Sequence, residues 1–564
     1  MAHTASTPLA KATVGTNPAR NPYTSQERKA LHYTAVILAF LGATGLFLGY
    51  ANPFAQIPPL ALLTPACLIL IGRLMPTAKG AFYGAWLCGA LGQTACLYWL
   101  TIPMHDFADI PWVFGIACVF LLGGYLGLYA ALFALGMKLF YSALPPFAAC
   151  LMAGPLWAGL ELARGWAFTG FPWVSLSTAF MAWPVWAQGA SLLGAYGLSG
   201  AYALIAACLT QAAPLRFIRG YEARPSRLTR GAALLLALIP FLLLYKHGMD
   251  SLREVVPEDT PRITAGLVQG NVNQSSKWEP AFQQHTVSRY LTLSEKAVDP
   301  ARGTVHKAVD LLIWPETAMP FYFEDNRALA VQLTNFASSR NVPLLFGAPG
   351  KGIGVRGEPT WHNRLWLYTP SPFGLQYYDK NHLVPFGEYV PLGIPIPFIE
   401  YLMQGLDFTP GTGSLLQMRL PGRDDGQVAL GALICYEAIF PEIAQMRVKD
   451  GAAILVNVSN DAWFGLSASP EQHLQLTAMR AVEQNRFILR ATNTGISAVI
   501  DNKGRVLTRG PLFKADCIVG EAALLEGKTP YHRMAGGLSL FFILCPLCMV
   551  PVCILLRVRK QRRP

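Results

Sequence analysis

The chain has 564 residues, of which 52% are hydrophobic and only 14% are charged. Soluble globular proteins carry about 25% charged residues, so this composition excludes an ordinary soluble protein and indicates one that crosses a membrane several times. The net charge of +12 is concentrated in segments that flank apolar stretches. Basic residues are not interleaved with aromatic ones in the way that nucleic-acid binding uses, so no nucleic-acid partner is expected.

The predicted membrane spans crowd into the first half of the chain and return once near its end. Each needs about 20 mostly apolar residues. Prolines interrupt the second span, and "FTGFPWVSLSTAF" (168–180) predicts a re-entrant or interfacial segment that faces a cavity, because non-helical backbone at membrane depth must be covered. The eight expected spans are 33–52, 56–75, 80–101, 112–136, 145–163, 186–212, 231–247 and 535–556.

The distribution of basic residues predicts the orientation. The loops at 53–55, 102–111 and 164–185 contain one basic residue between them, Arg164, whereas the alternate loops and both termini are rich in lysine and arginine. Basic residues favour the cytoplasmic side, so 250–530 is expected outside, in the periplasm of a bacterial cell. The expected parts are a cytoplasmic tail (1–32), seven spans (33–247), a periplasmic domain (250–530), an eighth span (535–556) and a basic cytoplasmic tail (557–564).

The outer domain alternates short apolar runs with helical patterns. Continuous apolar strands between helices indicate an α/β fold in which helices cover the sheets. The helical patterns fall at 280–298, 325–340 and 470–487. The runs are "RITAGLVQGN" (262–271), "DLLIWPE" (310–316), "VPLLFGAP" (342–349), "RLWLYTP" (364–370), "VALGALICYE" (428–437), "AAILVNVSND" (452–461) and "GISAVIDNKG" (495–504).

Three runs end in a chemically useful residue: Glu316, Cys435 and the pair Asn460-Asp461. Reactive groups tend to lie beyond strand carboxyl ends in such folds. The loop "YYDKNHLVPFGEYVP" (377–391) adds Lys380 and Glu388. Singly, each residue has an ordinary structural explanation, such as a helix cap, a surface lysine or a buried thiol. Together they supply a nucleophile, its base and a cation for a tetrahedral intermediate.

The histidines, including His382 and His473, show no metal-ligand spacing, so zinc chemistry is not expected. Nine of the 11 cysteines lie in predicted spans, which leaves Cys435 and Cys517 in the outer domain. In an oxidising compartment these two cysteines could form a disulfide, which is the alternative to a nucleophile. We expect Cys435 to be free and Cys517 to be buried elsewhere.

The order Glu316, Lys380, Cys435, in the contexts "WPE", "DKNHLVPFGE" and "CYE", resembles the Glu-Lys-Cys triad of the nitrilase superfamily. That resemblance implies an αββα sandwich. With eight spans, and with "VQGNVNQSSKW", "SNDAWFG" and "TNTGIS", the chain resembles the apolipoprotein N-acyltransferase family. The resemblance implies an inner-membrane enzyme without a cofactor, a phospholipid acyl donor and a diacylglyceryl-apolipoprotein acceptor; a monomer is expected.

The resemblance also implies residue roles. Cys435 would carry the acyl chain as a thioester, with Glu316 as the base, and Lys380 with the Tyr436 backbone N–H would hold the oxyanion. Lys380 is expected to lower the pKa of the thiol from about 8.5, and Glu437 to pair with a cation. The supporting carboxylates would be Glu388 and Glu437, and the aromatic residues at the mouth of the site would be Trp278, Phe386, Tyr389 and Trp463, unless these are ordinary core aromatics.

Two other functions are considered. A membrane-tethered amidase or nitrilase would use the same triad to hydrolyse a carbon–nitrogen bond, but it would not need eight spans. A transporter with an accessory domain would have more ionisable groups in its spans than Glu161 and Arg164, and no inverted repeat is seen.

Overall fold

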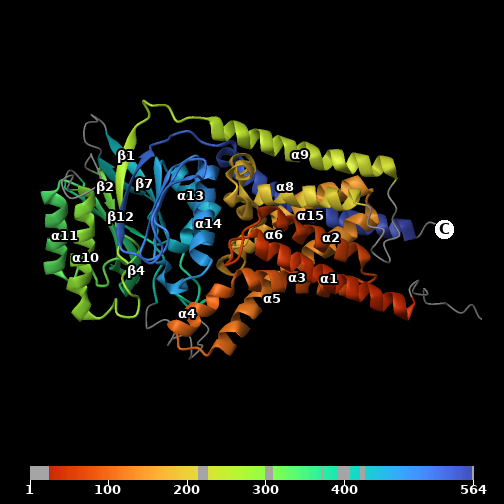
Figure 1. Ribbon diagram of the computed structural model, residues 1–564, viewed down its shortest axis with the longest axis horizontal. Helices are drawn as coiled ribbons and strands as arrows, with labels where there is room; N and C mark the ends of the chain where they lie inside the picture. Colours follow the sequence, from red (N-terminus) through yellow and green to blue (C-terminus); the bar gives the residue numbers. More distant parts are fainter. Residues whose placement is uncertain are drawn as a thin grey trace, which may run out of the picture.

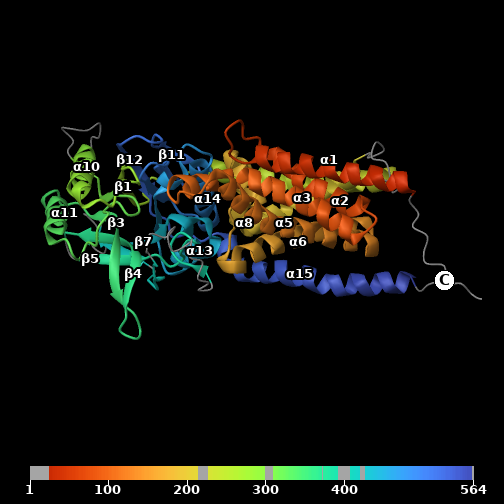
Figure 2. The same cartoon turned by 90° about the horizontal axis from the view of Figure 1, so that it is seen from below.

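The computed structural model describes residues 24–213, 226–298, 309–370, 373–391, 407–413, 415–419 and 426–561. They form a helical bundle and a domain of two sheets, which lie end to end (Figures 1 and 2). Most of the predicted tail at 1–32 lies outside the described residues, as do Arg216, Arg219 and Arg224 of the basic loop.

Every predicted span contains a helix, but only six of the described helices are long and apolar enough to cross a bilayer: α1, α5, α6, α8, α9 and α15. In the second predicted span a 3-10 turn at Pro58–Leu62 precedes the short helix α2. In the third, α3 carries four glycines and is not among the six. The bundle helices are α1 (Ser25–Gly49), α2 (Leu63–Leu74), α3 (Ala78–Cys96), α4 (Thr101–Asp106), α5 (Trp112–Ala143), α6 (Pro146–Trp166), α7 (Pro184–Ala187), α8 (Ala190–Ala212), α9 (Arg227–Arg253) and α15 (Pro530–Gln561).

Glycines in α3 allow it to pack closely against α5. A Cβ atom added at Gly89 would lie 2.6 Å from the Cβ of Ala130 and 2.9 Å from the Cα of Gly127. Small residues at such contacts are typical of membrane helices, where close backbone approach replaces the hydrophobic effect as the driving force. The glycines that reduce the apolar character of α3 therefore serve its packing.

The chain between α6 and α8 is not a continuous α-helix: it contains two 3-10 turns and the four-residue helix α7. Phe168 has φ +53° and the chain continues through a 3-10 turn at Leu176–Ala182. Its backbone is bonded from α6: Leu176 N–H donates to Glu161 Oε1 at 2.8 Å, and Arg164 Nη2 donates to Val174 O at 2.9 Å. Val174 and Leu176 line a cavity of about 50 Å³ together with Glu161 and Arg164. The expected cavity beside this segment is thus present, while its re-entrant or interfacial placement stays a prediction.

Two six-stranded sheets form the outer domain. Their orders are β12-β1-β2-β3-β4-β5 and β11-β10-β9-β8-β7-β6, with β1-β2-β3 and β7-β8-β9 parallel. The strands are β1 (Arg262–Gln269), β2 (Leu311–Ile313), β3 (Leu344–Ile353), β4 (Pro359–Thr369), β5 (Gly374–Asp379), β6 (Leu415–Arg419), β7 (Gln427–Ile434), β8 (Ile454–Ser459), β9 (Ile488–Thr492), β10 (Ala498–Ile500), β11 (Val506–Arg509) and β12 (Asp516–Ala523).

The layers are helix, sheet, sheet, helix, so the predicted αββα sandwich is confirmed. Apolar side chains from both sheets, such as Leu267, Leu345, Leu430 and Val456, pack together between them. The predicted helices α10 (Pro280–Val298) and α11 (Arg327–Ser339) cover one face, and α14 (Ser469–Gln484), with α13 (Pro441–Lys449), covers the other. This second pair lies between the sheets and the bundle (Figure 1).

Gln472 at the start of α14 joins the outer domain to the bundle with both ends of its amide. Its Oε1 accepts hydrogen bonds from the indoles of Trp99 (3.1 Å) and Trp173 (2.8 Å). Its Nε2 donates to the carbonyl oxygens of Ala51 (2.9 Å) and Cys96 (3.2 Å). The position of α14 is therefore determined by the membrane helices as well as by the sheet beneath it.

Candidate active site

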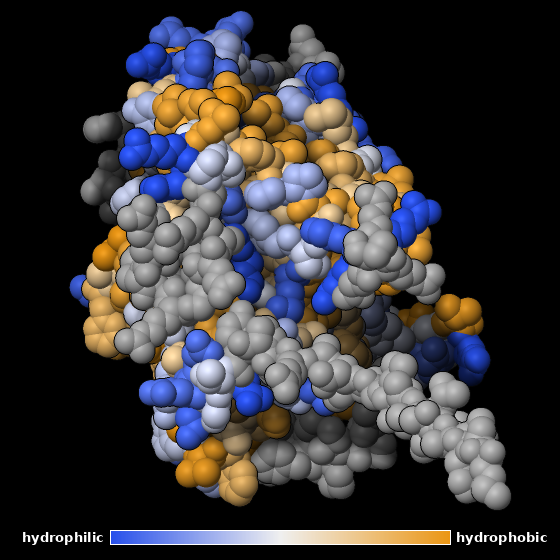
Figure 3. Space-filling view, turned by 90° about the vertical axis from the view of Figure 1, so that its right-hand side faces the viewer, coloured by the Kyte–Doolittle hydropathy of each residue, from blue (hydrophilic) through white to orange (hydrophobic). Residues whose placement is uncertain are grey.

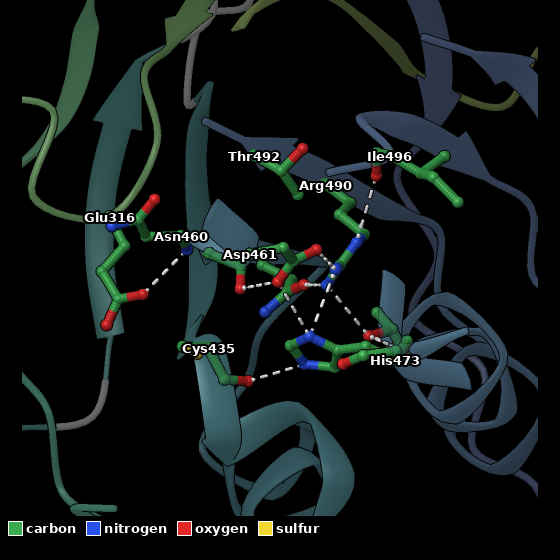
Figure 4. A network of polar contacts seen from close by, with 12 residues as sticks. Glu316, Cys435, Asn460, Asp461, His473, Arg490, Thr492 and Ile496 are labelled. Atoms are coloured by element: carbon green, nitrogen blue, oxygen red, sulfur yellow. Dashed lines mark hydrogen bonds and ion pairs between the residues drawn. The ribbon is translucent and has the colours of Figure 1, made fainter. Parts of the chain in front are cut away.

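The three residues of the expected triad leave the ends of three strands and meet between the sheets. Glu316 follows β2, Lys380 directly follows β5, and Cys435 directly follows β7. Figure 4 shows Glu316 and Cys435 on either side of the end of β8, where Asn460 begins the next loop. The three residues thus come together because each lies at or just beyond the carboxyl end of a strand.

Glu316 is held by three groups and is 7% exposed. Its Oε1 accepts hydrogen bonds from Asn363 Nδ2 at 2.7 Å and from Lys380 Nζ at 3.4 Å. Its Oε2 accepts one from the backbone N–H of Asn460 at 2.9 Å. Because both carboxylate oxygens accept hydrogen bonds, the Glu316 side chain has little freedom to rotate.

Lys380 is only 1% exposed and lies between two carboxylates. Its Nζ donates to Glu388 Oε1 at 2.9 Å, and Asn363 Nδ2 donates to the same oxygen at 2.7 Å. Burial opposes the charge, but Glu388 and Glu316 together raise the pKa of Lys380 well above its usual value. The site therefore contains a permanent ammonium group. Glu388 thus contacts Lys380, and the supporting role that the resemblance implied for it stays a prediction.

Cys435 has a backbone conformation that is rare outside glycine. Its φ is +49°, in the left-handed region, at the first position of a 3-10 turn, Cys435–Ile439. Such a residue costs about 1–2 kcal/mol, and strain of this kind clusters at functional sites. Cys435 and Cys517 are both free, as expected, but Cys517 is half-buried rather than buried, because it packs at the margin of the apolar cluster that includes Val268 and Leu312.

Lys380 lowers the pKa of the Cys435 thiol, as expected, but the net pKa is raised. Burial raises the pKa of Cys435 above its usual value, and the Glu316 charge raises it further; Lys380 opposes both effects but does not outweigh them. The resting Cys435 side chain is accordingly a neutral thiol. If it acts as the expected nucleophile, it needs a base at the moment of attack, and Glu316 is the carboxylate beside it that could act as one.

Among the described residues no cation forms a direct ion pair with Glu437, contrary to expectation, although the charge of Arg447 acts on it. It is fully buried, and its carboxylate accepts hydrogen bonds from the Tyr378 hydroxyl and from the backbone N–H groups of Asn381 and Ile434, each at 2.7 Å. The Arg447 guanidinium donates to the Tyr378 hydroxyl instead. These bonds connect the segment after Lys380 to the turn that begins at Cys435.

Among the four predicted substrate-binding aromatics, Trp463 makes a ring contact with the bundle. Trp463 packs edge-on against Phe107 of the bundle, with ring centroids 4.9 Å apart. Phe386 is 52% exposed and has φ +61°. Trp278 and Tyr389 are half-buried. Contact with substrate stays a prediction for all four.

Asn363 and the surroundings of His473 were not anticipated. Asn363 bonds both Glu316 and Glu388, yet it lies within β4 between His362 and Arg364, where nothing in the local sequence marks it out from its polar neighbours. His473 was considered only as a metal ligand, whereas it contacts the backbone of Cys435. Asp461, flagged at the end of β8, lies on the other side of the His473 ring.

Fold and site together define an enzyme domain of the carbon–nitrogen hydrolase class. Residues 264–525 match the family described as carbon-nitrogen hydrolase, and residues 44–208 match the apolipoprotein N-acyltransferase N-terminal domain. The Nesterenkonia AN1 amidase from the nitrilase superfamily aligns with 50% of this chain and 98% of its own, at 19% identity and a TM-score of 0.35.

Relatives that match this chain over most of its length identify its family. The apolipoprotein N-acyltransferase of Geobacter metallireducens is 37% identical over 495 residues, which are 87% of this chain and 90% of the relative. That of Nitrosomonas europaea is 34% identical over 536 residues, 92% of this chain and 97% of the relative. The chain belongs to the apolipoprotein N-acyltransferase family, and it is a membrane protein with several apolar helices.

Proposed function

We propose that this acyltransferase moves a fatty acyl chain from a membrane phospholipid to the N-terminal α-amino group of S-diacylglyceryl-cysteine in apolipoproteins. The observation that carries the proposal is a thiol, a carboxylate and a buried ammonium assembled at strand ends directly above a bundle of apolar helices. Membership of the family supports the lipoprotein substrate. The tethered amidase has less support, because the membrane half also matches this family.

The first half-reaction would form a thioester. Glu316 takes the proton of the Cys435 thiol as the sulfur attacks the ester carbonyl, and Lys380 with the Tyr436 N–H stabilises the oxyanion. The ester C–O bond then breaks, and the proton held by Glu316 passes to the departing lysophospholipid. The enzyme is left acylated on sulfur, with Glu316 ionised again.

The second half-reaction would repeat this geometry with an amine. The α-amino group of the lipoprotein cysteine attacks the thioester carbonyl, and the same donors hold the second oxyanion. Glu316 accepts the proton from nitrogen, the C–S bond breaks, and the proton returns to Cys435. A C–N bond replaces the C–S bond with no change in oxidation state, which is consistent with the absence of any required cofactor.

Both substrates carry long acyl chains, and transfer of such a chain from the bilayer into water costs about 0.8 kcal/mol per CH₂. Removal of such chains from the bilayer would cost tens of kcal/mol, so the reaction favours a site seated on the membrane. The contacts of Gln472 and Trp463 with bundle residues support such a seat.

Intact mass spectrometry tests the proposal. After incubation of the purified full-length enzyme with phospholipid alone, we expect a mass increase of one acyl chain, lost again when an apolipoprotein peptide is added. Cys435→Ala should show no adduct, whereas the matched control Cys517→Ala should show it fully. An adduct that water removes as fast as the peptide does would instead favour the tethered amidase, and no adduct on Cys435 would contradict the proposal.

We also propose that the two-sheet domain lies in the periplasm and that the chain sits in the inner membrane. The start of α1, the start of α9 and the end of α15 lie at the end of the bundle remote from the sheets (Figures 1 and 2). Figure 3 views this end, where hydrophilic side chains gather among apolar ones. Arg28, Arg227 and Arg557 are near these helix ends, which supports a cytoplasmic location for them.

Reporter fusions test this orientation. Alkaline phosphatase, which folds only after export, should be active when fused after residue 270 and inactive when fused after residue 225. A green fluorescent reporter at the C-terminus should fluoresce, because it matures in the cytoplasm. The reverse pattern would place the catalytic domain in the cytosol, away from exported lipoproteins.

A further inference from the structure

A buried histidine that the mechanism above does not use lies directly behind the nucleophile. His473, in the first turn of α14, is 1% exposed, and its Nε2 lies 3.1 Å from the carbonyl oxygen of Cys435. Its Nδ1 lies 3.2 Å from Asp461 Oδ1 (Figure 4). The imidazole is thus placed between the backbone of the catalytic cysteine and a buried carboxylate.

The ring is held firmly on the side away from Cys435. Arg490 donates to Asp461 Oδ2 at 2.8 Å and lies 3.3 Å from His473 Nδ1, and the Ser459 hydroxyl donates to Asp461 Oδ1 at 2.7 Å. Burial and Arg490 lower the pKa of His473, while Asp461 opposes them. The Cys435 carbonyl and the Asp461 carboxylate both only accept hydrogen bonds, so the doubly protonated imidazole donates to each. In the neutral ring, a hydrogen on Nε2 keeps the bond to Cys435 and leaves Nδ1 to accept from Arg490.

The bond to Cys435 matters because of the peptide that the carbonyl belongs to. The Cys435 C=O and the Tyr436 N–H are parts of one planar, trans peptide unit, so they point in opposite directions. Fixing the oxygen therefore aims the N–H. The left-handed φ of Cys435 is strained and would relax by rotating this same peptide, which a bond to the oxygen resists.

The position of His473 is set by its neighbours in the bundle. The preceding residue, Gln472, makes four hydrogen bonds to Trp99, Trp173, Ala51 and Cys96. The Trp173 ring also packs on the imidazole, with centroids 5.5 Å apart. Movement of His473 away from Cys435 would have to break these contacts.

We propose that His473 is a positioning residue, which holds the Cys435–Tyr436 peptide so that the thiol faces Glu316 and the Tyr436 N–H faces the developing oxyanion. This inference rests on the proposed function. It assigns to His473 no proton transfer and no contact with substrate. Its hydrogen-bond donor to the Cys435 carbonyl is what matters, and a neutral donor at the same place should replace it.

The test uses full-length enzyme in detergent with phospholipid vesicles and follows the rate of acyl-enzyme formation. In His473→Leu, kcat for acylation should fall by about 100-fold, as when an oxyanion donor is lost, with KM for phospholipid within about 2-fold, since binding is not affected. His473→Gln places an amide donor near the Nε2 position and should recover kcat to within about 5-fold of wild type.

The matched control is His532→Leu, since His532 is a buried histidine that bonds Gln484 rather than Cys435, and its kcat should equal wild type. Thermal unfolding checks that each variant is folded. The inference is overturned by wild-type kcat in His473→Leu, or by a folded His473→Gln as slow as the leucine variant. If His473→Leu does not fold, the test rests on His473→Gln: a folded variant with kcat more than about 5-fold below wild type overturns the inference. Absence of acyl-enzyme in the wild type would instead refute the proposed function.

Discussion

In Glu316→Gln we expect acylation of Cys435 to stop while the same thiol becomes easier to alkylate. Glutamine keeps the shape of the side chain and can still bond Lys380 through its oxygen, but it cannot accept a proton. Because the resting thiol is neutral, loss of the base should reduce acyl-enzyme formation by about 100- to 10,000-fold, the range found for general base catalysis. The loss should precede acylation, so no adduct accumulates.

Alkylation should change in the opposite direction because it depends on the thiolate population. The charge of Glu316 is the second largest cause, after burial, of the raised pKa of Cys435. Its removal should lower the pKa at which iodoacetamide reacts with Cys435, so that at pH 8 the variant is modified faster than wild type. The free energy of unfolding should change as well. Because the thiol pKa is raised on folding, the folded protein loses stability at pH values above the pKa of the unfolded thiol. This loss should be smaller in the variant.

Both rates are measured on the same preparation by intact mass, with Glu324→Gln as the matched control. Glu324 is a carboxylate of the same domain that bonds Arg364 and does not contact the triad, so neither rate should change. Full acyl-enzyme in Glu316→Gln would show that another group is the base. Unchanged alkylation would show that Glu316 does not act on the thiol electrostatically.

Lys380→Ala should lose both half-reactions, by about 100- to 1000-fold each, because one cation stabilises both oxyanions. The variant also leaves Glu316 and Glu388 close together without their shared partner. Removal of one member of a buried ion pair typically costs about 3–5 kcal/mol, so a lower melting temperature is expected as well. Removal of the ammonium should raise the pKa of Cys435 further, since Lys380 is the main group that lowers it.

Single-turnover rates separate the two half-reactions: acylation with phospholipid alone, and transfer from preformed acyl-enzyme to peptide. Lys351→Ala is the control, since Lys351 forms an exposed ion pair with Asp325 outside the site. Exposed pairs contribute about 0–1 kcal/mol, so activity and melting temperature should stay near wild type. A folded Lys380→Ala enzyme that keeps either half-reaction would exclude a shared oxyanion role.

The helices of the bundle and the strands that carry the triad could be predicted from sequence because both signals are local. A run of apolar residues, or a short apolar strand that ends in a reactive residue, is visible without knowledge of its neighbours. The same reasoning missed β5, β6, β9 and β11, in which polar residues interrupt the apolar run, as in "GLQYYD", "LLQMR", "ILRAT" and "VLTR". It also counted eight spans where six meet the criteria of length and hydropathy, because prolines and glycines weaken α2 and α3.

The chemical state of the site was decided by tertiary structure alone. Whether the Cys435 thiol is neutral depends on how deeply it is buried and on which charge lies nearer, and both follow from segments far apart in the chain. For the same reason the hydrogen-bond partners of Glu437 are backbone N–H groups rather than a cation. Likewise, His473 contacts the carbonyl of Cys435, which is 38 residues away in the sequence. Residue types and order reveal which groups are available to react; distances and burial, which only the folded chain sets, determine their charges and orientations.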